Sequence, residues 1–461
     1  MGYATIAVSG HQETWAVRST YFQDYLAHCF YESEKTAPNA QALQEALGVI
    51  NAKARWDGHE LPVFTRVAEW EGSIYLDLGD SAWRAVEIMS PGWSIVSHPP
   101  VRFRRSNGML ALPVPVPGGH ISSLRRFVNV KDEDFVLLVM WLIAALRPSG
   151  PYPVLTLFGE QGNAKSTTAR VLRALVDPAK ALIRALPQNE RDLMISASCS
   201  HVVAFDNISN LAPWLSDALC RLATGGGMAT RRLFTDEEET IFEAQRPALL
   251  NGIEDVARNG DLLDRMVVLS LPAISDKKRR DEALFWSEFE ADRPQILGAL
   301  LNAVSAALKN LPTVKLEEKP RMADFAIWAT AAENTAGFKE GEFIRAYDRN
   351  RKEGSDVALE SSPIANGVYE FMQHKKLWKG TNGELLASLR IQVGADSHRR
   401  AWPISPRALT NALARAQPNL RNIGITISRS REPGTGRRLI TLEKTATEGS
   451  QPSQPSPAQS D

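Results

Sequence analysis

Hydrophobic and polar positions alternate with strand and helix periods along the chain, and this pattern predicts its organisation. In residues 1–120, helical patterns near 18–32 and 39–53 precede short runs rich in Val, Ile, Tyr and Trp. Gly or Asp turns separate these runs, which predict strands at Val63–Trp70, Ser73–Leu78, Trp83–Ile88, Trp93–Ser97 and Val101–Arg104. We therefore expect an α+β domain over 1–120, with a linker at the Pro- and Gly-rich stretch Leu112–Gly119.

Over residues 121–275 the sequence pattern changes to apolar strands followed by helical segments, which is typical of an α/β domain. The apolar run Phe135–Leu146 has twelve residues, whereas a membrane span needs about 20, so it predicts a buried helix. Residues 276–360 are helical in pattern and predict a lid or linker. Their apolar positions recur at helix spacing, at Leu297, Leu300, Leu301, Val304 and Leu308.

The end of the chain differs in charge from the rest. Residues 361–445 hold 14 Lys and Arg against 5 Asp and Glu, a net charge of +9, although the whole chain balances 53 basic against 53 acidic residues. Any basic surface that binds nucleic acid is therefore expected to be confined to part of the chain, such as residues 361–445. Residues 446–461 are polar and rich in Gln, Pro and Ser, so we expect a disordered tail.

Cysteine and histidine usage argues against a disulfide framework, a zinc ribbon or a metal cluster. Cys29, Cys199 and Cys220 lie far apart and form no CxxC pair, and the eight histidines are scattered. The first residues lack the basic-then-apolar pattern of a signal peptide. These features predict a soluble cytoplasmic protein without a membrane partner.

The strongest chemical signal lies between an apolar strand, Pro153–Phe158, and a helix, Thr168–Val176. A glycine-bearing loop that leads into a helix opening with Lys-Ser offers backbone N–H groups and a helix N-terminus to a triphosphate. The Lys165 ammonium would reach the β- and γ-phosphates, and the Ser166 hydroxyl would complete a magnesium shell. We expect ATP and magnesium to bind here, through Gly159, Gly162, Asn163, Ala164, Lys165, Ser166 and Thr167.

One position departs from the P-loop pattern GxxxxGK[ST], because Ala164 stands where that pattern has glycine. If the backbone there needs a positive φ, alanine costs on the order of 1 kcal/mol. The alternative is a turn of small residues capped by Ser166.

A second apolar strand, His201–Asn207, contains Asp206, which we expect to hold the magnesium; a turn or helix cap is the alternative. Asn207 follows, where most ATPases of this class place an acid that polarises the attacking water. An amide cannot take a proton, although it could orient water, so the sequence predicts slow turnover.

A third strand, Arg246–Leu250, ends at Asn251, which we expect to contact the γ-phosphate or the lytic water; an Asn-Gly turn is the alternative. Arg265 precedes a fourth strand, Met266–Leu271, and suits an arginine finger. A surface salt bridge with Asp264 would explain it equally well.

The order and compactness of Lys165, Asp206, Asn251 and Arg265 resemble the superfamily III helicases, which are AAA+ ATPases of viruses, phages and plasmids. The likeness is greatest to the poxvirus/phage-type primase–helicases and their relatives on integrative elements, and it extends to the segment Trp214–Gly227. It implies a P-loop AAA+ core over 121–275, a homo-oligomer in the form of a hexameric ring, and an Arg265 that acts on a neighbour's nucleotide. No polymerising primase motif is visible in residues 1–130, so a separate primase is a possible partner.

The same resemblance implies a DNA-contacting hairpin between the second and third strands. Arg231, Arg232 and Phe234 fall in the matching stretch and could contact phosphates and bases. The acidic turn Asp236–Glu239 has the wrong sign for a loop that grips DNA, which argues against efficient unwinding.

The basic region at 361–445 predicts a second DNA-binding element. Ser405 and Pro406 suit the cap and first turn of a helix on which Arg407, Asn411 and Arg415 share one face. A hairpin follows, with four arginines near its tip, and helix plus basic hairpin resembles a winged helix. The alternative is a solvated face or a protein-docking module. The four hairpin residues are Arg429, Arg431, Arg437 and Arg438.

Together these features predict a DNA-dependent, helicase-like ATPase that replicates or maintains a mobile genetic element. The first alternative is a nucleotide-switched DNA-binding or loading protein with little or no hydrolysis, which Asn207 and the acidic hairpin favour. The second is a DNA-binding regulator with a vestigial phosphate loop.

Overall fold

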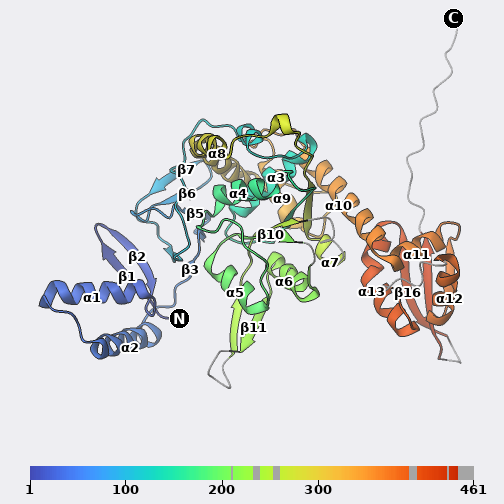
Figure 1. Ribbon diagram of the computed structural model, residues 1–461, viewed down its shortest axis with the longest axis horizontal. Helices are drawn as coiled ribbons and strands as arrows, with labels where there is room; N and C mark the ends of the chain where they lie inside the picture. The colour runs from blue at the N-terminus through green and yellow to red at the C-terminus, as the bar shows by residue number, and fades with distance from the viewer. Residues whose placement is uncertain (209–210, 232–238, 253–259, 394–401, 433–435, 445–461) are drawn as a thin grey trace, which may run out of the picture. The chain divides into compact units, whose positions relative to one another are not determined.

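The computed structural model describes residues 1–208, 211–231, 239–252, 260–393, 402–432 and 436–444 (Figure 1). Contacts within the chain divide it into two compact units. Unit 1 comprises Met1–Val256 and Arg265–Arg349, and unit 2 comprises Ala257–Asp264 and Asn350–Asp461. Across the described residues, the helices fall short of the length and apolar character that a bilayer crossing needs.

Unit 1 begins with a hairpin and two helices around a small core of Val17, Phe22 and Leu47. The helices confirm the sequence prediction, and Ser19 and Asn39 cap them with their side chains. The hairpin was not predicted because its strands mix polar and apolar residues, although the Ser9-Gly10 turn between them is a hairpin signal. The bounds are β1 (Tyr3–Val8), β2 (His11–Ala16), α1 (Thr20–Glu34) and α2 (Ala40–Trp56).

The next strands form an antiparallel sheet in the order β4-β5-β6-β7, with β3 and β8 paired beside it. The strand expected at Val63–Trp70 is split in two at Arg66, whose φ is +65° and whose guanidinium is fully buried. The bounds are β3 (Val63–Phe64), β4 (Val67–Trp70), β5 (Ser73–Asp77), β6 (Ala85–Ile88), β7 (Trp93–Val96) and β8 (Arg102–Phe103).

The stretch Leu112–Gly119 lies outside the helices and strands, turns at residues 117–118, and is held by backbone contacts. The Leu112 N–H donates to the Leu78 carbonyl at 2.8 Å, and the Val116 N–H donates to the Pro294 carbonyl at 3.0 Å. A Cβ at Gly298 would lie 2.0 Å from the Val116 carbonyl oxygen, so this close approach requires glycine.

Four parallel strands form the central sheet, in the order β10-β13-β9-β14. Their buried, continuous apolar character matches the expected α/β pattern. Arg184 adds a single parallel bridge to Phe205 on the open side of β10. The strands are β9 (Val154–Phe158), β10 (Val203–Ile208), β13 (Ala248–Gly252) and β14 (Met266–Ser270).

Helices surround this sheet (Figure 1). The expected helix at 135–146 is found as α3 (Phe135–Ala145), in which every residue is buried, and it packs against α8 and α9. The helical pattern after residue 276 is likewise confirmed. The other helices are α4 (Lys165–Val176), α5 (Glu190–Cys199), α6 (Pro213–Thr224), α8 (Glu282–Asn310), α9 (Ala323–Ala332) and α10 (Glu342–Ser361), of which α10 continues into unit 2. A separate hairpin joins β11 (Gly227–Arg231) to β12 (Glu239–Glu243).

Unit 2 holds three helices against a three-stranded antiparallel sheet of order β15-β17-β16, together with the short α7 (Gly260–Leu263). Leu409 and Leu413 lie four residues apart on one helix and are fully buried, and Ser405 caps this helix by accepting from the Ala408 N–H. The elements are α11 (Pro363–Met372), β15 (Leu377–Gly380), α12 (Asn382–Val393), α13 (Pro406–Asn422), β16 (Ile425–Arg431) and β17 (Arg438–Lys444).

Candidate functional site

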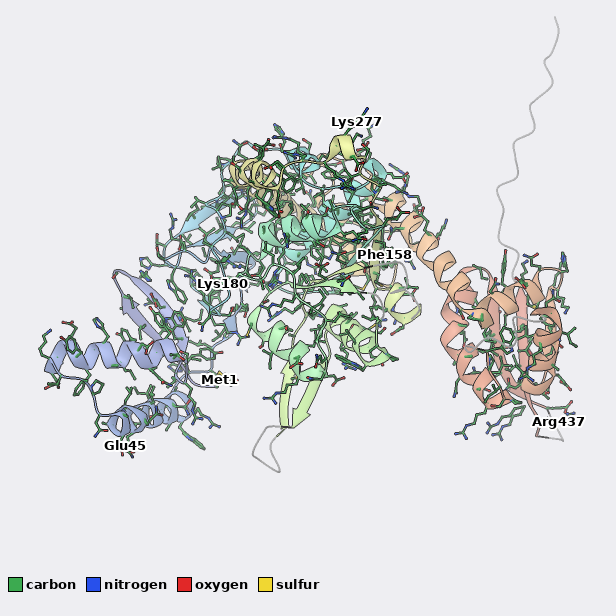
Figure 2. The ribbon with its side chains drawn as sticks, in the orientation of Figure 1. Met1, Glu45, Phe158, Lys180, Lys277 and Arg437 are labelled. Carbon is green, nitrogen blue, oxygen red and sulfur yellow. The ribbon has the colours of Figure 1, made fainter. Side chains whose placement is uncertain are left out.

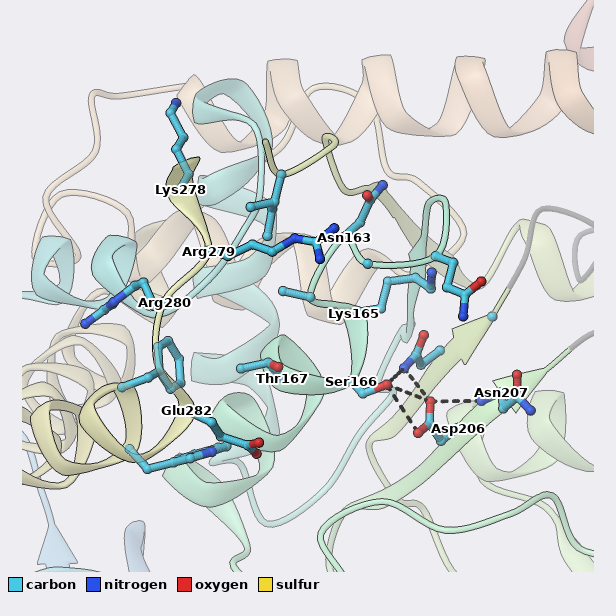
Figure 3. Close-up of a pocket in the computed structure, with 18 residues that line it drawn as sticks. Asn163, Lys165, Ser166, Thr167, Asp206, Asn207, Lys278, Arg279, Arg280 and Glu282 are labelled. Atoms are coloured by element: carbon cyan, nitrogen blue, oxygen red, sulfur yellow. Dashed lines mark hydrogen bonds between the residues drawn. The ribbon is translucent and has the colours of Figure 1, made fainter. Parts of the chain in front are cut away.

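Three polar side chains from different elements meet at the carboxyl edge of the central sheet (Figure 3). The Ser166 Oγ lies 3.2 and 3.3 Å from the two carboxylate oxygens of Asp206. The Asn251 Nδ2 donates to Ser166 Oγ at 3.0 Å and to an Asp206 oxygen. Parallel strands bring their carboxyl ends to one edge, which is why residues so far apart in sequence converge here.

The loop from Gly159 to Ala164 joins β9 to α4 through a backbone that turns sharply. Gly159 has φ +143°, and a Cβ there would lie 2.9 Å from the Leu271 carbonyl oxygen, so only glycine fits. Gly162 has φ +88°. Ala164 sits at the N-terminal boundary of α4 with φ +57°, so the condition under which alanine is strained at this position is met. Alanine there costs about 1 kcal/mol relative to an unstrained residue.

Lys165 begins α4 and folds back over the loop. Its Nζ donates to the carbonyl oxygens of Gly159 and Glu160, at 2.7 Å each. The ammonium thus stands beside the backbone that would surround an anion, at the positive end of the helix dipole. Ser166 and Thr167 follow in the first turn of α4, and both line a cavity beside the loop.

Asn163 supports the loop from within. Its side chain is buried and its Nδ2 donates to the Leu271 carbonyl at 2.9 Å. The Asn163 carbonyl in turn accepts from the Asn129 Nδ2 at 3.0 Å. Because its side chain is engaged in this way, Asn163 can make the expected ligand contacts only through its main chain.

Asn207 lies at an irregularity of β10. The pairing with β13 shifts register between Phe205 and Ile208, and Asn207 has φ +57°, a conformation that asparagine tolerates better than most residues. Its N–H donates to the Asp206 Oδ1 at 2.9 Å, while its side chain lies on the side of Asp206 away from Ser166 (Figure 3). The positive φ therefore favours asparagine at this position, independently of any role in catalysis.

Arg265 is not brought to this cluster. Its carbonyl accepts from the Val154 N–H at 2.8 Å, which places it beside the amino end of β9. Asp206, Asn251 and the phosphate-loop candidates lie at the opposite, carboxyl edge of the sheet. Within one chain, Arg265 is separated from them by the length of the strands.

A cavity of about 980 Å³ opens above the cluster. Sequence reasoning found the side of the cavity formed by residues 161–167, 206–207 and 251–252. It missed the opposite wall, which comes from the segment after β14 and the start of α8. The visible signal for this wall was the run of four basic residues at 277–280. The lining residues on that wall are Ile274, Lys278, Arg279, Arg280, Glu282, Phe285 and Trp286.

The donor set fits a hard cation held together with a phosphate ligand. A hydroxyl and a carboxylate face each other, and hydroxyl, carboxylate and phosphate oxygens are the ligands that Mg²⁺ prefers. The buried Asn251 Oδ1 has no hydrogen-bond partner among the described residues. The described part of the chain holds no group of three or more His, Cys, Asp or Glu that could bind a metal ion.

A buried ionic network fixes the far end of α4. The Asp177 carboxylate accepts from Arg66 Nε at 3.0 Å and from the N–H groups of His201 and Val202 at 2.9 and 3.0 Å. Burial opposes the charge of Asp177, yet Arg66 and Arg173 outweigh it and lower the pKa of this carboxyl. Burial also lowers the pKa of His201 to about 4, so the ring is neutral and hydrogen-bonds the Ala145 carbonyl. The network ties α4 to the start of β10 and so helps position Ser166 against Asp206.

Unit 2 carries an exposed basic surface. Arg407 and Asn411 are exposed on α13, and Arg437 is exposed on the hairpin of β16 and β17 (Figure 2). Arg431 and Arg438 are exposed register partners across that hairpin, and Arg429 is exposed on β16. Like charges facing each other destabilise a sheet, so the pairing of Arg431 with Arg438 is not explained by the stability of the hairpin.

Four expected DNA contacts lie where the structure does not describe the side chain. Arg415 lies in α13 and Arg231 ends β11, but only their backbones are described. Arg232, Phe234 and most of the acidic turn fall outside the described residues.

Comparison with known proteins gives two family matches. Residues 121–351, half of the chain, match the model of the actinomycete integrative conjugative element replication protein. Residues 364–456 match the model of the RepA C-terminal domain of the same elements. No curated protein sequence matches the chain.

Solved structures give weak likenesses. One is titled as the A form apo structure of the NrS-1 C-terminal region; it has a TM-score of 0.40 and 12% identity, over 96% of this chain and 94% of the other. Another, of NrS-1 residues 305–718, has a TM-score of 0.38 and 10% identity, over 96% and 93%. Scores this low carry no argument about the site.

Proposed function

The chain belongs to the replication proteins of actinomycete integrative conjugative elements, and from that membership we propose that it is an ATP-binding, DNA-dependent ATPase of helicase type. It would act in the replication or maintenance of such an element. The proposed core is a P-loop AAA+ domain of the superfamily III kind, to which the order of the four parallel strands is suited.

The observation that carries the proposal is the convergence of Ser166, Asp206 and Asn251 beside Lys165 at the carboxyl edge of the sheet. Lys165 would bind the β- and γ-phosphates, and Ser166 with Asp206 would hold the magnesium ion. Bound magnesium supplies charge neutralisation at the phosphates. Asn251 already donates to this cluster, and its free carbonyl oxygen is available to orient a water or a ligand proton donor.

DNA binding is proposed for unit 2. The element order helix, strand, two helices and a two-stranded hairpin is that of a winged helix, with α13 in the place of the recognition helix. Exposed Arg407 and Asn411 on α13, and the hairpin arginines, would contact phosphates and base edges.

We also propose a homo-oligomer, by resemblance a hexameric ring, and the place of Arg265 supports it. Because this arginine lies at the opposite edge of the sheet from its own Asp206, it would serve as a finger only on the nucleotide of a neighbouring subunit. We also propose that a separate primase is a partner of this protein.

A second candidate function is a nucleotide-switched DNA-binding or loading protein that hydrolyses ATP little or not at all. Asn207 favours it, because an amide in this position cannot act as a general base. Asn207→Glu distinguishes the two if steady-state turnover is measured. A rise in turnover would show that the missing base limits hydrolysis, whereas no change would mean that another residue fills this role.

Equilibrium binding of ATP with magnesium tests the shared premise of both functions. Lys165→Ala should abolish binding, while Lys53→Ala, an exposed lysine on α2, should leave it unchanged. Equal binding by wild type and Lys165→Ala would overturn the assignment of the site.

A further inference from the structure

The segment at residues 272–281, here called the strap, is held at both ends, and at its start it is tied to the phosphate-loop candidate. At its start, the Pro272 carbonyl accepts from the Asn129 Nδ2 at 2.7 Å, and the same amide donates to the Asn163 carbonyl. At its end, Arg280 donates to the Arg126 carbonyl at 2.9 Å, and Asp281 caps α8 by accepting from the Leu284 N–H at 3.0 Å. The strap is therefore fixed beside the cavity.

Within the strap, Arg279 extends toward the loop that contains Asn163 and Lys165, whereas Lys278 and Arg280 point away from it (Figure 3). An Arg279 Nη2 lies 3.6 Å from the position that a Cβ on Gly162 would take. Lys277 projects outward at the surface (Figure 2). Arg279 is thus the strap cation that faces the loop.

The ion pair of Arg279 within the strap is weak. Its guanidinium lies 3.3 Å from the Asp276 carboxylate, in an i,i+3 pair whose side chains are 64% and 92% exposed. Such exposed pairs contribute about 0–1 kcal/mol, so the guanidinium can exchange this partner for a phosphate at little cost. Arg280, in contrast, is engaged by Glu288 and lies over the Phe285 ring.

We propose that Arg279 binds the phosphate groups of the nucleotide in its own chain, from the wall of the cavity opposite the 159–164 loop. The inference rests on the proposed function, because it requires a nucleotide at that loop. Lys165 supplies one positive charge, and a triphosphate carries more negative charge than this lysine and a magnesium ion neutralise. A guanidinium presents paired donors that match phosphate oxygens. Besides Asp276, the acids at this cavity are Asp206 and Glu282, and Glu282 lies 3.6 Å from Arg170.

The test compares Arg279→Ala, Arg279→Lys and the matched control Lys277→Ala, an exposed strap lysine outside the cavity lining, in the full chain. Dissociation constants for ATP, ADP and AMP are measured with magnesium by calorimetry. Arg279→Ala should weaken ATP binding about tenfold or more, weaken ADP binding less, and leave AMP binding unchanged. Arg279→Lys should recover part of the loss, and Lys277→Ala should bind as the wild type does.

The dependence on phosphate number separates a phosphate contact from general damage to the strap. Equal loss for ATP and AMP, or unchanged ATP binding in Arg279→Ala, would overturn the inference while the proposed function stands. If the wild type itself fails to bind ATP, the proposed function fails, and the inference fails with it.

Discussion

The Ser166 hydroxyl lies 3.2 Å from the Asp206 carboxylate, although forty residues separate the two along the chain. Ser166 is placed by the first turn of α4 and Asp206 by the irregular end of β10, so strand order rather than sequence proximity creates the pair. A hydroxyl and a carboxylate at this distance can share one hard cation. The first prediction follows from this pair.

Asp206→Asn should remove the magnesium dependence of ATP binding. The amide keeps the size of the carboxylate but loses its charge, so added magnesium should tighten binding in the wild type and not in the variant. Titration of ATP with and without magnesium measures this. Asp217→Asn, an exposed change on α6, is the matched control and should behave as wild type. Magnesium-dependent binding that persists in Asp206→Asn would remove Asp206 from the metal site.

Ala164→Gly should stabilise the protein by about 0.5–1 kcal/mol. The residue adopts φ +57°, which glycine reaches without the strain that alanine bears, although glycine also loses more backbone entropy on folding. Chemical denaturation measures the change. Ala46→Gly, at an exposed site within α2, should instead destabilise by about 1 kcal/mol, and a decrease in stability at both sites would contradict the conformational argument.

Arg429→Ala combined with Arg431→Ala should weaken DNA binding and flatten its salt dependence. The two residues alternate on β16 and so share one face of the sheet. The slope of log K against log salt should fall by about 0.9 for each DNA phosphate that the variant no longer neutralises. Lys375→Ala is the control, because its ammonium already lies 3.3 Å from the centroid of the Phe371 ring. An unaltered slope in the double variant would exclude these residues from the DNA interface.

The free energy of unfolding should fall as the pH drops from about 6.5 toward 4. His201 has its pKa lowered to about 4 by burial, against 6.5 in the unfolded chain, so in this window the unfolded state binds the extra proton. The loss attributable to this residue is about 3 kcal/mol. His201→Gln, which keeps a donor for the Ala145 carbonyl, should reduce the pH dependence measured by urea unfolding. An identical dependence in the variant would contradict the assignment.

The local part of the site could be predicted from the sequence because its signals are local. A strand that runs into Gly159 and a helix that opens at Lys165 are visible as pattern, and apolar runs that end at Asp206 and Asn251 predict one common edge. The positive φ of Ala164 was raised only as a condition, because Ala164 stands where the loop pattern has glycine.

The opposite wall of the cavity could not be predicted in this way. Arg279 reaches the loop only because Asn129 and Asn163 bind the backbone near the start of the strap, and these contacts span more than a hundred residues. The inward side chain of Asn163 and the buried pairing of Arg66 with Asp177 have the same long-range origin. A run of charged residues or an isolated polar residue does not show, from the sequence alone, which side chain is buried in the fold.

Steady-state ATP hydrolysis, with and without single- and double-stranded DNA, tests the central claim most directly. The account predicts turnover that DNA stimulates and that Lys165→Ala eliminates. Tight ATP binding without turnover under any of these conditions would contradict the ATPase and favour the nucleotide switch. Turnover that survives Lys165→Ala would contradict the assignment of the ATP site to Lys165 and its neighbours.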